Sequence, residues 1–476
     1  MTHTDGSNSL ARGHARTFPF PGILLCLCLG LRLILFAVHQ PWNPSVVEQH
    51  VLKGDALGYH RLALTLVEHG RFAAAADALP EALRTPLYPL FVGLTYILSG
   101  YRPWVTLLAQ VLLDTMACLL LYYALRRLLS PAPAAVAATF YACDPFLILY
   151  SSSTLLSDSL FVFLLVAAFW FAARTWAVPE SSKFLHLAAG TGLCIGLATL
   201  TRPIAQFVLL CYFPFYLLAF RHRLRAGLQC VLVSAVVCLA TLSPWLIRNS
   251  AVFGAPAVST VGPWSMLAMN VLPVEVAKRH QDERTVMRSL AAEADRMMEA
   301  DGLRPEALNE FQRMRYWQQL AIRYVLRDPV AFAARHTKGI VRTLFNLDTQ
   351  HYIVRFHLKA ESLDLDAHPD LGGLVKAYVA KKGAVGLLVG GPLLLYLLVS
   401  YTSAAAGLVA GWTRYPKAVL LLCLLLAVYF VLLSGASGFA RYRLPAVPFG
   451  LAFAGIGWRR LRSIRWPRRR GQPAGG

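Results

Sequence analysis

The chain alternates between long apolar runs and short polar links. Ten of the runs approach the length that a helix needs to cross roughly 30 Å of hydrocarbon. A bilayer offers backbone groups no hydrogen-bond partner, so spanning runs of this kind fold as helices. The pattern predicts an all-α polytopic membrane protein with about ten spans. The predicted spans are 20–39, 104–125, 133–150, 160–173, 185–200, 204–220, 228–247, 384–401, 418–434 and 444–456.

The charges between the runs predict an orientation. Arg12 and Arg16 precede the first run, and links dense in arginine and lysine recur wherever the chain returns to that side. Such links stay in the cytoplasm, so we predict cytoplasmic N- and C-termini. A cleaved signal peptide is the competing interpretation of 20–39. No small-residue cleavage site follows this run, which favours an uncleaved first span.

The apolar segment 86–99 is predicted to lie on the membrane surface. As a helix it would be roughly 21 Å long, which is too short to cross the hydrocarbon. Counting it as a span would also place the basic links outside, against the orientation rule. Together with a short amphipathic helix after Asp55 it supplies the interfacial helices of a first external loop, residues 40–103.

Residues 250–382 are polar and hold most of the remaining acids. Three helices are predicted there, at 282–302, 305–326 and 330–347. Asp328 is the expected N-cap of the third helix, with Pro329 at its first position. Apolar and basic faces are typical of an interfacial helix, and the third helix has both. We therefore divide the chain into three parts: a membrane catalytic module (1–249), a small external helical subdomain (250–382), and C-terminal spans with a basic cytoplasmic tail (383–476).

Composition agrees with this class of protein. Hydrophobic residues make up 57% of the chain and charged residues only 15%, against about 25% charged in soluble proteins. The net charge of +21 lies in short clusters between apolar runs, without the basic, aromatic-lined face of nucleic-acid binders. No nucleic-acid partner is predicted. All nine cysteines lie in or beside apolar runs, which favours packing over disulfides or metal ligation.

The predicted topology gathers charged and polar residues at the outer ends of the spans. One acid and several arginines at a membrane edge suit a lipid-phosphate substrate, because guanidinium groups bind phosphate bidentately and a carboxylate can accept a proton from a hydroxyl. The predicted catalytic residues are Asp55 and Asp158. The predicted substrate-binding residues are Tyr59, His60, Arg84, Tyr88, Arg202, Arg248, Asn249, Arg441 and Arg443.

Simpler structural roles compete with these assignments. Asp55 has the position of an N-cap for the helix that follows it, and Asp158 could cap a span in the same way. A single arginine at the end of a span can be a snorkelling anchor. Asp114 lies well inside a span, where pairing with Arg32 is the expected role. The histidines show no metal-ligand spacing, so no metal site is predicted.

Six segments of the chain resemble membrane glycosyltransferases with the C-type fold. Within that fold, they are most similar to the bacterial group related to protein O-mannosyltransferases and to the aminoarabinose transferase of lipid A. The resemblance covers residues 20–253 and returns in the C-terminal spans. The segments are GDALGYHRLALTLVEHGRF, ALRTPLYPLFVGLTYILSG, LSDSLF, LTRPIA, SPWLIRNSAVFG and ARYRLPAVP, in that order.

This resemblance implies transfer of a sugar from a polyprenyl-phosphate donor to an acceptor hydroxyl on the non-cytoplasmic face of a bacterial inner membrane. It implies that Asp55 is the catalytic acid of the first loop, that Asp158 matches a second acid, and that Arg84 is the basic residue near the phosphate. The chain departs from the family pattern where Ala56 follows Asp55 in place of a second acid. It also departs where Thr85 replaces the first proline of a pair.

Two other functions remain open from the sequence. A transporter or flippase for lipid-linked sugars would need alternating access, commonly built from repeats, and no repeat is visible. A non-catalytic scaffold is the third interpretation. The predicted partners are the bilayer, a polyprenyl-phosphate-linked sugar and an acceptor that could be lipid, glycan or protein. No cofactor is predicted, and a divalent cation stays open.

Overall fold

The computed structural model describes residues 20–177, 183–358 and 371–463, and every regular element within them is a helix. Arg12, Arg16 and the end of the predicted basic tail lie outside the described residues. The all-α membrane fold predicted from the sequence is therefore confirmed.

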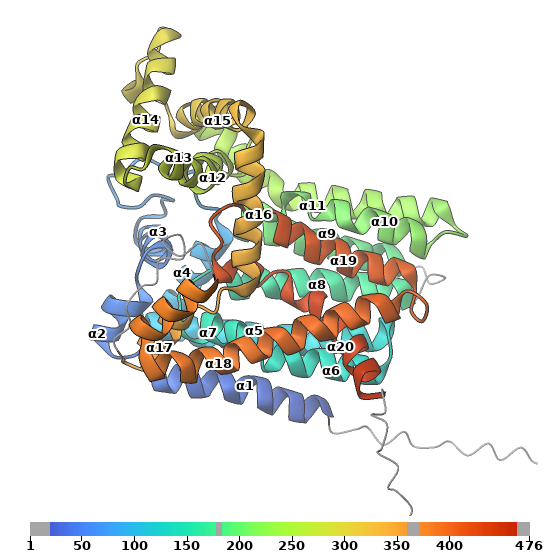
Figure 1. The fold of residues 1–476 in the computed structure, drawn as a ribbon. Helices are drawn as coiled ribbons and strands as arrows, with labels where there is room; N and C mark the ends of the chain where they lie inside the picture. Colours follow the sequence, from blue (N-terminus) through green and yellow to red (C-terminus); the bar gives the residue numbers. More distant parts are fainter. Residues whose placement is uncertain (1–19, 178–182, 359–370, 464–476) are drawn as a thin grey trace, which may run out of the picture.

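Most of the long apolar helices run side by side along one common direction (Figure 1). This membrane part comprises α1 (Phe20–His39), α5 (Pro103–Leu128), α6 (Pro131–Ala142), α7 (Pro145–Ser153), α8 (Asp158–Ala177), α9 (Phe184–Thr201), η2 (Pro203–Phe207), α10 (Leu209–Ala219), α11 (Leu224–Phe253), α18 (Leu371–Gly411), α19 (Lys417–Leu432), η5 (Ala440–Arg443) and α20 (Val447–Ser463).

Two groups of shorter helices lie at one end of the membrane part (Figure 1). The first group follows α1 and comprises α2 (Pro44–Val46), η1 (Val47–Val51), α3 (Asp55–His69) and α4 (Leu87–Ser99). The second group, called here the polar helical unit, comprises α12 (Val261–Ser265), η3 (Met266–Val271), α13 (Leu272–Arg279), α14 (Glu283–Ala300), η4 (Pro305–Ala307), α15 (Glu310–Arg327) and α16 (Pro329–Phe345). Helix α17 (Thr349–Arg355) then leads back to α18.

Helix length decides how many spans the structure supports. Among the residues that the structure describes, six helices are long and apolar enough to cross a membrane, and a seventh span results if α6 and α7, which are bent by 49°, cross as a pair. The break between them falls at Asp144, which caps α7 by accepting from the backbone N–H groups of Phe146 and Leu147. Helices α10, α19 and α20 have fewer than 18 residues. The predicted count of ten spans is not confirmed.

Local capping explains where the helices of the polar helical unit begin. Asp282 caps α14, and Asp328 caps α16 with Pro329 at its first position, so both helices start as predicted. The middle helix starts five residues later than the predicted 305. Asn309 and Gln312 form a reciprocal capping box there, and this box fixes the first turn of α15.

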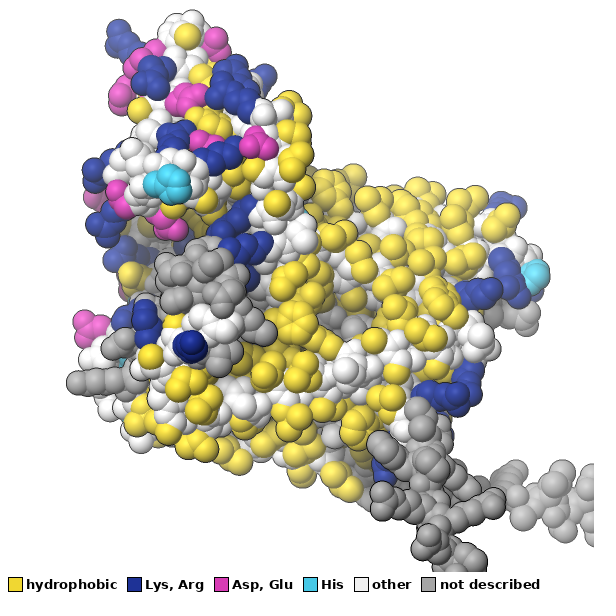
Figure 2. Space-filling view, viewed as in Figure 1, with side chains coloured by type: hydrophobic (Ala, Val, Ile, Leu, Met, Phe, Trp, Pro, Cys, Tyr) yellow, Lys and Arg dark blue, Asp and Glu magenta, His cyan; other side chains and the backbone are white. Residues whose placement is uncertain are grey.

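The buried apolar side chains form two separate cores. The large core joins the membrane helices, and a small one joins η3, α13, α14 and α15 through residues such as Leu267, Leu290, Met298 and Leu320. In Figure 2, hydrophobic side chains cover most of the visible face of the membrane part. Lys and Arg side chains gather on the polar helical unit and at the end where α10 joins α11. This distribution is that of a protein whose central belt contacts lipid.

The predicted ion pair inside the membrane part is confirmed. Arg32 Nε of α1 donates to Asp114 Oδ2 of α5 over 2.5 Å, and both side chains are buried. Tyr141 donates to the other carboxylate oxygen over 2.5 Å. Because each charged group is partnered inside the bundle, this pair ties α1 to α5 and does not reach the cluster described below.

Candidate active site

Asp55 is the first residue of α3, and its carboxylate does not cap the helix. The N-cap is Gly54, whose φ of 55° and ψ of −124° lie where glycine is favoured, and it makes no side-chain cap bond. The capping interpretation of Asp55 is therefore wrong. A negative charge in the first turn still interacts favourably with the helix dipole, while both carboxylate oxygens are turned toward arginines.

Two acids and three arginines from five separated segments meet beside α3. Arg441 Nη2 of η5 donates to Asp55 Oδ2 over 3.0 Å, and Arg84 Nη2 lies 3.8 Å from Asp55 Oδ1. Arg202, at the end of α9, donates through Nη1 to Asp158 Oδ1 at the start of α8. Arg441 Nε lies 3.9 Å from Asp158 Oδ2. We call these five residues the Asp55–Asp158 cluster.

The two acids of the cluster differ in their access to solvent. The Asp55 side chain is 50% exposed, whereas that of Asp158 is 2% exposed. Within the described part of the chain, Asp158 Oδ2 and Arg441 Nε are buried without a hydrogen-bond partner. The centre of the cluster thus holds a donor and an acceptor that face each other beyond hydrogen-bond distance, next to an acid that a substrate can reach.

The electrostatics of the cluster keep Asp55 ionised. Burial raises the pKa of Asp55, but Arg441, then Arg84 and Arg202, outweigh this effect and hold the pKa below its ordinary value. In the same way, burial lowers the pKa of Arg441, while Asp158 and Asp55 raise it above its ordinary value. The three guanidinium groups face the two carboxylates of the cluster and the Glu81 carboxylate, which accepts from Arg84 Nη1. A phosphate can therefore bind by taking over guanidinium contacts that carboxylates hold here.

Two tyrosines form the wall behind the cluster. The Arg84 guanidinium lies over the Tyr59 ring, 5.4 Å from its centroid, and Tyr59 Oη lies 3.3 Å from Ser157 Oγ. Tyr88 packs edge-on against Tyr59 with ring centroids 4.7 Å apart, and its hydroxyl donates to Gln110 Oε1 over 2.5 Å. Tyr59 touches the cluster directly, whereas Tyr88 is fully buried and supports it.

His60 and Arg443 are not brought to the cluster. His60 Nδ1 lies 2.7 Å from the hydroxyl of Tyr96 in α4. Arg443 is buried, and its Nη1 donates to the carbonyls of Thr343, Leu344 and Asn346 at the end of α16 over 2.9–3.0 Å. It therefore satisfies carbonyl groups that the helix end leaves without partners.

Arg248 and Asn249 lie at the end of α11 and bind backbone groups. Arg248 Nη1 donates to the Glu81 carbonyl over 3.1 Å and to Asn249 Oδ1 over 2.8 Å. Asn249 Nδ2 donates to the Ala257 carbonyl over 2.6 Å. The Arg248 guanidinium also lies over Trp245, 4.7 Å from its ring centroid. Neither residue reaches Asp55.

Sequence reasoning missed Glu81, which shares Arg84 with Asp55. Glu81 Oε1 accepts from Arg84 Nη1 over 2.9 Å, and the Glu81 side chain is 13% exposed. Burial raises the pKa of Glu81 above its ordinary value even though Arg84 lowers it. The signal that could have found it is an acid three residues before Arg84 within the same polar link.

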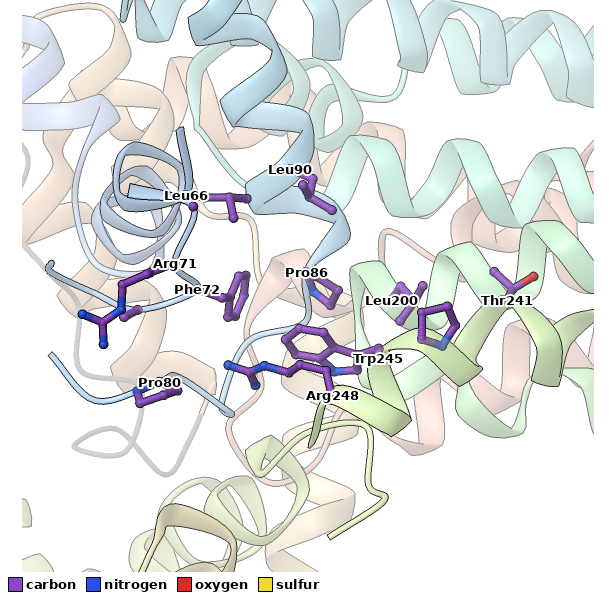
Figure 3. A pocket seen from close by; sticks show the side chains of 13 residues that line it. Leu66, Arg71, Phe72, Pro80, Pro86, Leu90, Leu200, Thr241, Trp245 and Arg248 are labelled. Atoms are coloured by element: carbon purple, nitrogen blue, oxygen red, sulfur yellow. The ribbon is translucent and has the colours of Figure 1, made fainter. Parts of the chain in front are cut away.

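An apolar cavity of about 550 Å³ adjoins the link between α3 and α4. Figure 3 shows Phe72, Pro86 and Trp245 around it, with Arg248 running beside Trp245. Leu90 and Leu200 belong to the same wall, and Arg71 and Arg248 are the charged lining residues. The cavity has the chemistry of a site for a hydrocarbon chain with cations at one side.

The side chains that could ligate a metal ion are scattered over the described part of the chain. Among residues 20–177, 183–358 and 371–463 there is no group of three or more His, Cys, Asp or Glu side chains that could hold a metal ion. The prediction that the site works without a metal stays a prediction.

Comparisons with known proteins identify the fold. Residues 83–247 match the family model for dolichyl-phosphate-mannose-protein mannosyltransferase. The oligosaccharyltransferase of Archaeoglobus fulgidus, solved with a tethered acceptor peptide, superposes with a TM-score of 0.52 at 12% identity over 94% of this chain and 50% of that chain. The apo form of the same enzyme gives 0.51 over 94% and 52%. No curated protein matches the chain in sequence.

A third similar structure is ArnT of Cupriavidus metallidurans bound to undecaprenyl phosphate, with 16% identity over 91% of this chain and 76% of that chain. Its TM-score is 0.41. The chain spans about half the length of the oligosaccharyltransferase.

Together, the family match and the shared architecture confirm the predicted resemblance. The chain has the C-type fold of membrane glycosyltransferases related to the protein O-mannosyltransferases. The match begins at residue 83, so it includes Arg84, Asp158 and Arg202 but not Asp55 or Arg441.

Proposed function

We propose that this protein transfers a glycosyl group from a polyprenyl-phosphate donor to an acceptor hydroxyl by inverting displacement. The observation that carries the proposal is the Asp55–Asp158 cluster, in which a half-exposed, ionised carboxylate stands among three arginines. A carboxylate can accept the acceptor's proton, and guanidinium groups can bind the donor's phosphate. The reaction needs a base for the acceptor and a binding group for the phosphate at the same place.

In the proposed step the acceptor oxygen forms a bond to the anomeric carbon as the bond from that carbon to the phosphate oxygen breaks. Asp55 takes the hydroxyl proton, and the polyprenyl phosphate leaves as an anion with the bonding electron pair. Attack opposite to the leaving group inverts the anomeric carbon. Positioning the two substrates together supplies a large part of the rate enhancement.

The arginines stabilise the leaving phosphate. Arg84 and Arg441 lie on either side of Asp55, and both are partly exposed, by 21% and 19%. Arg202 is already bound to Asp158, so we assign it mainly to holding that acid in place. Charge that grows on the phosphate oxygen is stabilised by donors already oriented toward it, which lowers the barrier of the chemical step.

The apolar cavity beside Pro86 is the proposed site for the first part of the polyprenyl chain. It adjoins the link that carries Arg84, so a lipid phosphate bound at Arg84 would have its chain at the cavity. Arg248 lines the cavity while it donates to the Glu81 carbonyl, so we assign it to the cavity wall.

The proposal places the cluster on the non-cytoplasmic face of a bacterial plasma membrane, with the termini in the cytoplasm. It also treats 250–382 as an external subdomain between the membrane module 1–249 and the C-terminal spans. The positive-inside pattern of the links supports this orientation. The external subdomain lies on the same side of the membrane part as the cluster, so we assign it to acceptor binding.

The test uses Asp55→Asn, which removes the basic carboxylate and leaves the size of the side chain almost unchanged. We expect transfer from polyprenyl-phosphate sugar to fall about 10³-fold, because general-base catalysis contributes on the order of 10²–10⁴. Asp77→Asn is the matched control, because Asp77 is exposed in the link after α3 and has no part in the cluster.

The measurement is release of polyprenyl phosphate by purified protein in detergent. Wild-type turnover in Asp55→Asn would show that the assignment is wrong. Sugar-lipid movement in vesicles without release of lipid phosphate would favour the flippase alternative instead.

A further inference from the structure

The carbonyl groups of the three residues before Arg84 are held by α11 and by the segment after it. The carbonyl of Glu81 accepts from Arg248 Nη1 of α11, that of Ala82 from the Thr260 N–H over 3.1 Å, and that of Leu83 from the Ser259 hydroxyl. Two of these three consecutive carbonyls are thus fixed to the segment after α11. The position of Arg84 therefore depends on that segment as well as on its own link.

Glu310, the first residue of α15, contacts both the link before Arg84 and the segment after α11. Its Oε2 accepts from the Ala82 N–H over 3.0 Å, and its Oε1 accepts from the Thr260 hydroxyl. Ala82 and Thr260 are both fully buried. Without the Glu310 carboxylate, the Ala82 N–H would be buried without a partner, which is costly, so the backbone before Arg84 would shift to find another.

The place of Glu310 in α15 is itself fixed. Asn309 caps the helix through its capping box with Gln312, and Asn309 Nδ2 donates to the Phe253 carbonyl at the end of α11 over 2.9 Å. The carboxylate is therefore delivered from a rigid first turn. The polar helical unit thus contacts Ala82, which is more than 200 residues from Glu310 in sequence and lies two positions before Arg84.

We propose that Glu310 is a positioning residue that sets Arg84 for the donor phosphate and thereby couples the polar helical unit to the Asp55–Asp158 cluster. This inference rests on the proposed function, because it takes Arg84 as a phosphate ligand. Glu310 touches neither the substrate nor the reacting atoms. Its effect passes through the Ala82 N–H and the backbone of the link to the Arg84 side chain.

The experiment measures binding of polyprenyl monophosphate to the purified full-length protein in detergent. Glu310→Ala removes both acceptor oxygens, and we expect affinity to fall about tenfold, the fold-change that corresponds to one lost hydrogen bond from Arg84 to the phosphate. Glu310→Gln should bind close to wild type. Its amide oxygen can still accept from Ala82, and the Thr260 hydroxyl can turn to accept from the amide group.

Two further variants separate positioning from general damage. Glu293→Ala removes an acceptor for the Tyr324 hydroxyl within the same polar helical unit, and we expect unchanged binding. Arg84→Ala should bind weakly, and adding Glu310→Ala to it should cause no further loss. Two changes that act through one contact are not additive.

Each outcome decides a different claim. Weak binding in Arg84→Ala with wild-type binding in Glu310→Ala would overturn the positioning role and leave the proposed function intact. The positioning role would also be overturned if Glu310→Ala lowered the affinity by the same factor in the wild-type protein and in Arg84→Ala. The effect of Glu310 would then not pass through Arg84. Wild-type binding in Arg84→Ala would reject Arg84 as a phosphate ligand. If Glu310→Ala does not yield folded protein, Glu310→Asp, which shortens the side chain by one methylene, replaces it in the same comparison.

Discussion

At the scale of single residues, the charge on Asp55 depends on arginines that are distant in sequence. Arg441 donates directly to its carboxylate, and Arg84 lies slightly farther away. A carboxylate held in this way stays ionised under ordinary conditions. Because its pKa is lowered, Asp55 is also a weaker base. Its role as a general base therefore depends on its position beside the acceptor as much as on its pKa.

This balance predicts the pH dependence of Arg441→Gln. Removing the guanidinium takes away the main stabilisation of the ionised form, so the pKa of Asp55 rises. Activity that needs ionised Asp55 is lost as the pH falls through this pKa. We therefore expect the acid limb of kcat/KM to move to higher pH in the variant. At neutral pH we expect kcat/KM to fall about a hundredfold, because a charge that stabilises the leaving phosphate is lost.

A pH profile of kcat/KM checks this, with Arg61→Gln as the control. Arg61 lies in the same helix α3 and is exposed, and its replacement should leave the acid limb in place. An unshifted limb in Arg441→Gln would mean that Asp55 is not the group that titrates.

At the scale of elements, the loop between α19 and η5 brings Arg441 to the site. Gly435 and Gly438 have φ of 72° and 70°, where a side chain is disfavoured. The loop is fastened to η3, because the Ala436 N–H donates to Asn270 Oδ1 over 3.1 Å. It also packs on α16, where a Cβ added at Gly339 would lie 2.4 Å from the Gly435 carbonyl oxygen.

We predict that Gly435→Ala weakens both the fold and the activity. The positive φ costs an alanine about 1–2 kcal/mol, and its Cβ would lie 2.9 Å from Asn270 Oδ1. The loop must shift to relieve this contact, and Arg441 moves with it. Thermal unfolding in detergent should show a lower Tm, and turnover should fall at least several-fold.

Gly391→Ala is the matched control for this change. Its added Cβ meets nothing within 4 Å and its φ is not positive, so Tm and turnover should stay close to wild type. A Gly435→Ala protein with both values unchanged would show that the loop's backbone does not constrain Arg441.

At the scale of the whole molecule, the helix bundle has two different ends. Helix α3, which begins with Asp55 of the cluster, and the polar helical unit lie at one end, and the link between α10 and α11 lies at the other (Figure 1). The latter link carries exposed basic residues. By the positive-inside rule these residues predict a cytoplasmic position for this link, which supports the proposed placement of the cluster on the opposite side.

Cysteine labelling tests this orientation. We predict that a membrane-impermeant maleimide labels Asp77→Cys in spheroplasts. We expect His222→Cys to be labelled only after the membrane is opened. Both positions are exposed, one in the link after α3 and the other in the link after α10. Wild-type protein measures the background from the nine native cysteines. The reverse pattern would place the cluster in the cytoplasm and reject a donor presented from outside.

Much of this molecule follows from local patterns in the sequence. Apolar runs predict the membrane helices because burial in lipid needs continuous hydrophobic surface. The capping residue Asp328 with Pro329 predicts the start of α16, because both act within one turn. The buried pair of Arg32 and Asp114 was also predictable, since an ionised group within a span needs a partner of opposite charge.

The site depended on contacts that no local pattern encodes. Arg441 and Arg443 stood as equal candidates in the sequence. They lie two residues apart in a 3₁₀ turn, where such side chains point in different directions, and only the packing of η5 against α16 turned Arg441 to Asp55 and Arg443 to carbonyls. Arg248 likewise had the position of a phosphate ligand but binds the Glu81 backbone.

The sequence by itself determined the all-α membrane class, the long apolar helices and the residue types that the candidate site can draw on, because periodicity, capping and charge act over a few residues. Within the candidate site, tertiary structure alone decided which acid meets which arginine. Asp55 and Arg441 are separated by 386 positions, and Glu310 reaches Ala82 across 228. Such contacts exist only after the helices have packed, since packing fixes the distances between groups that the chain itself leaves independent.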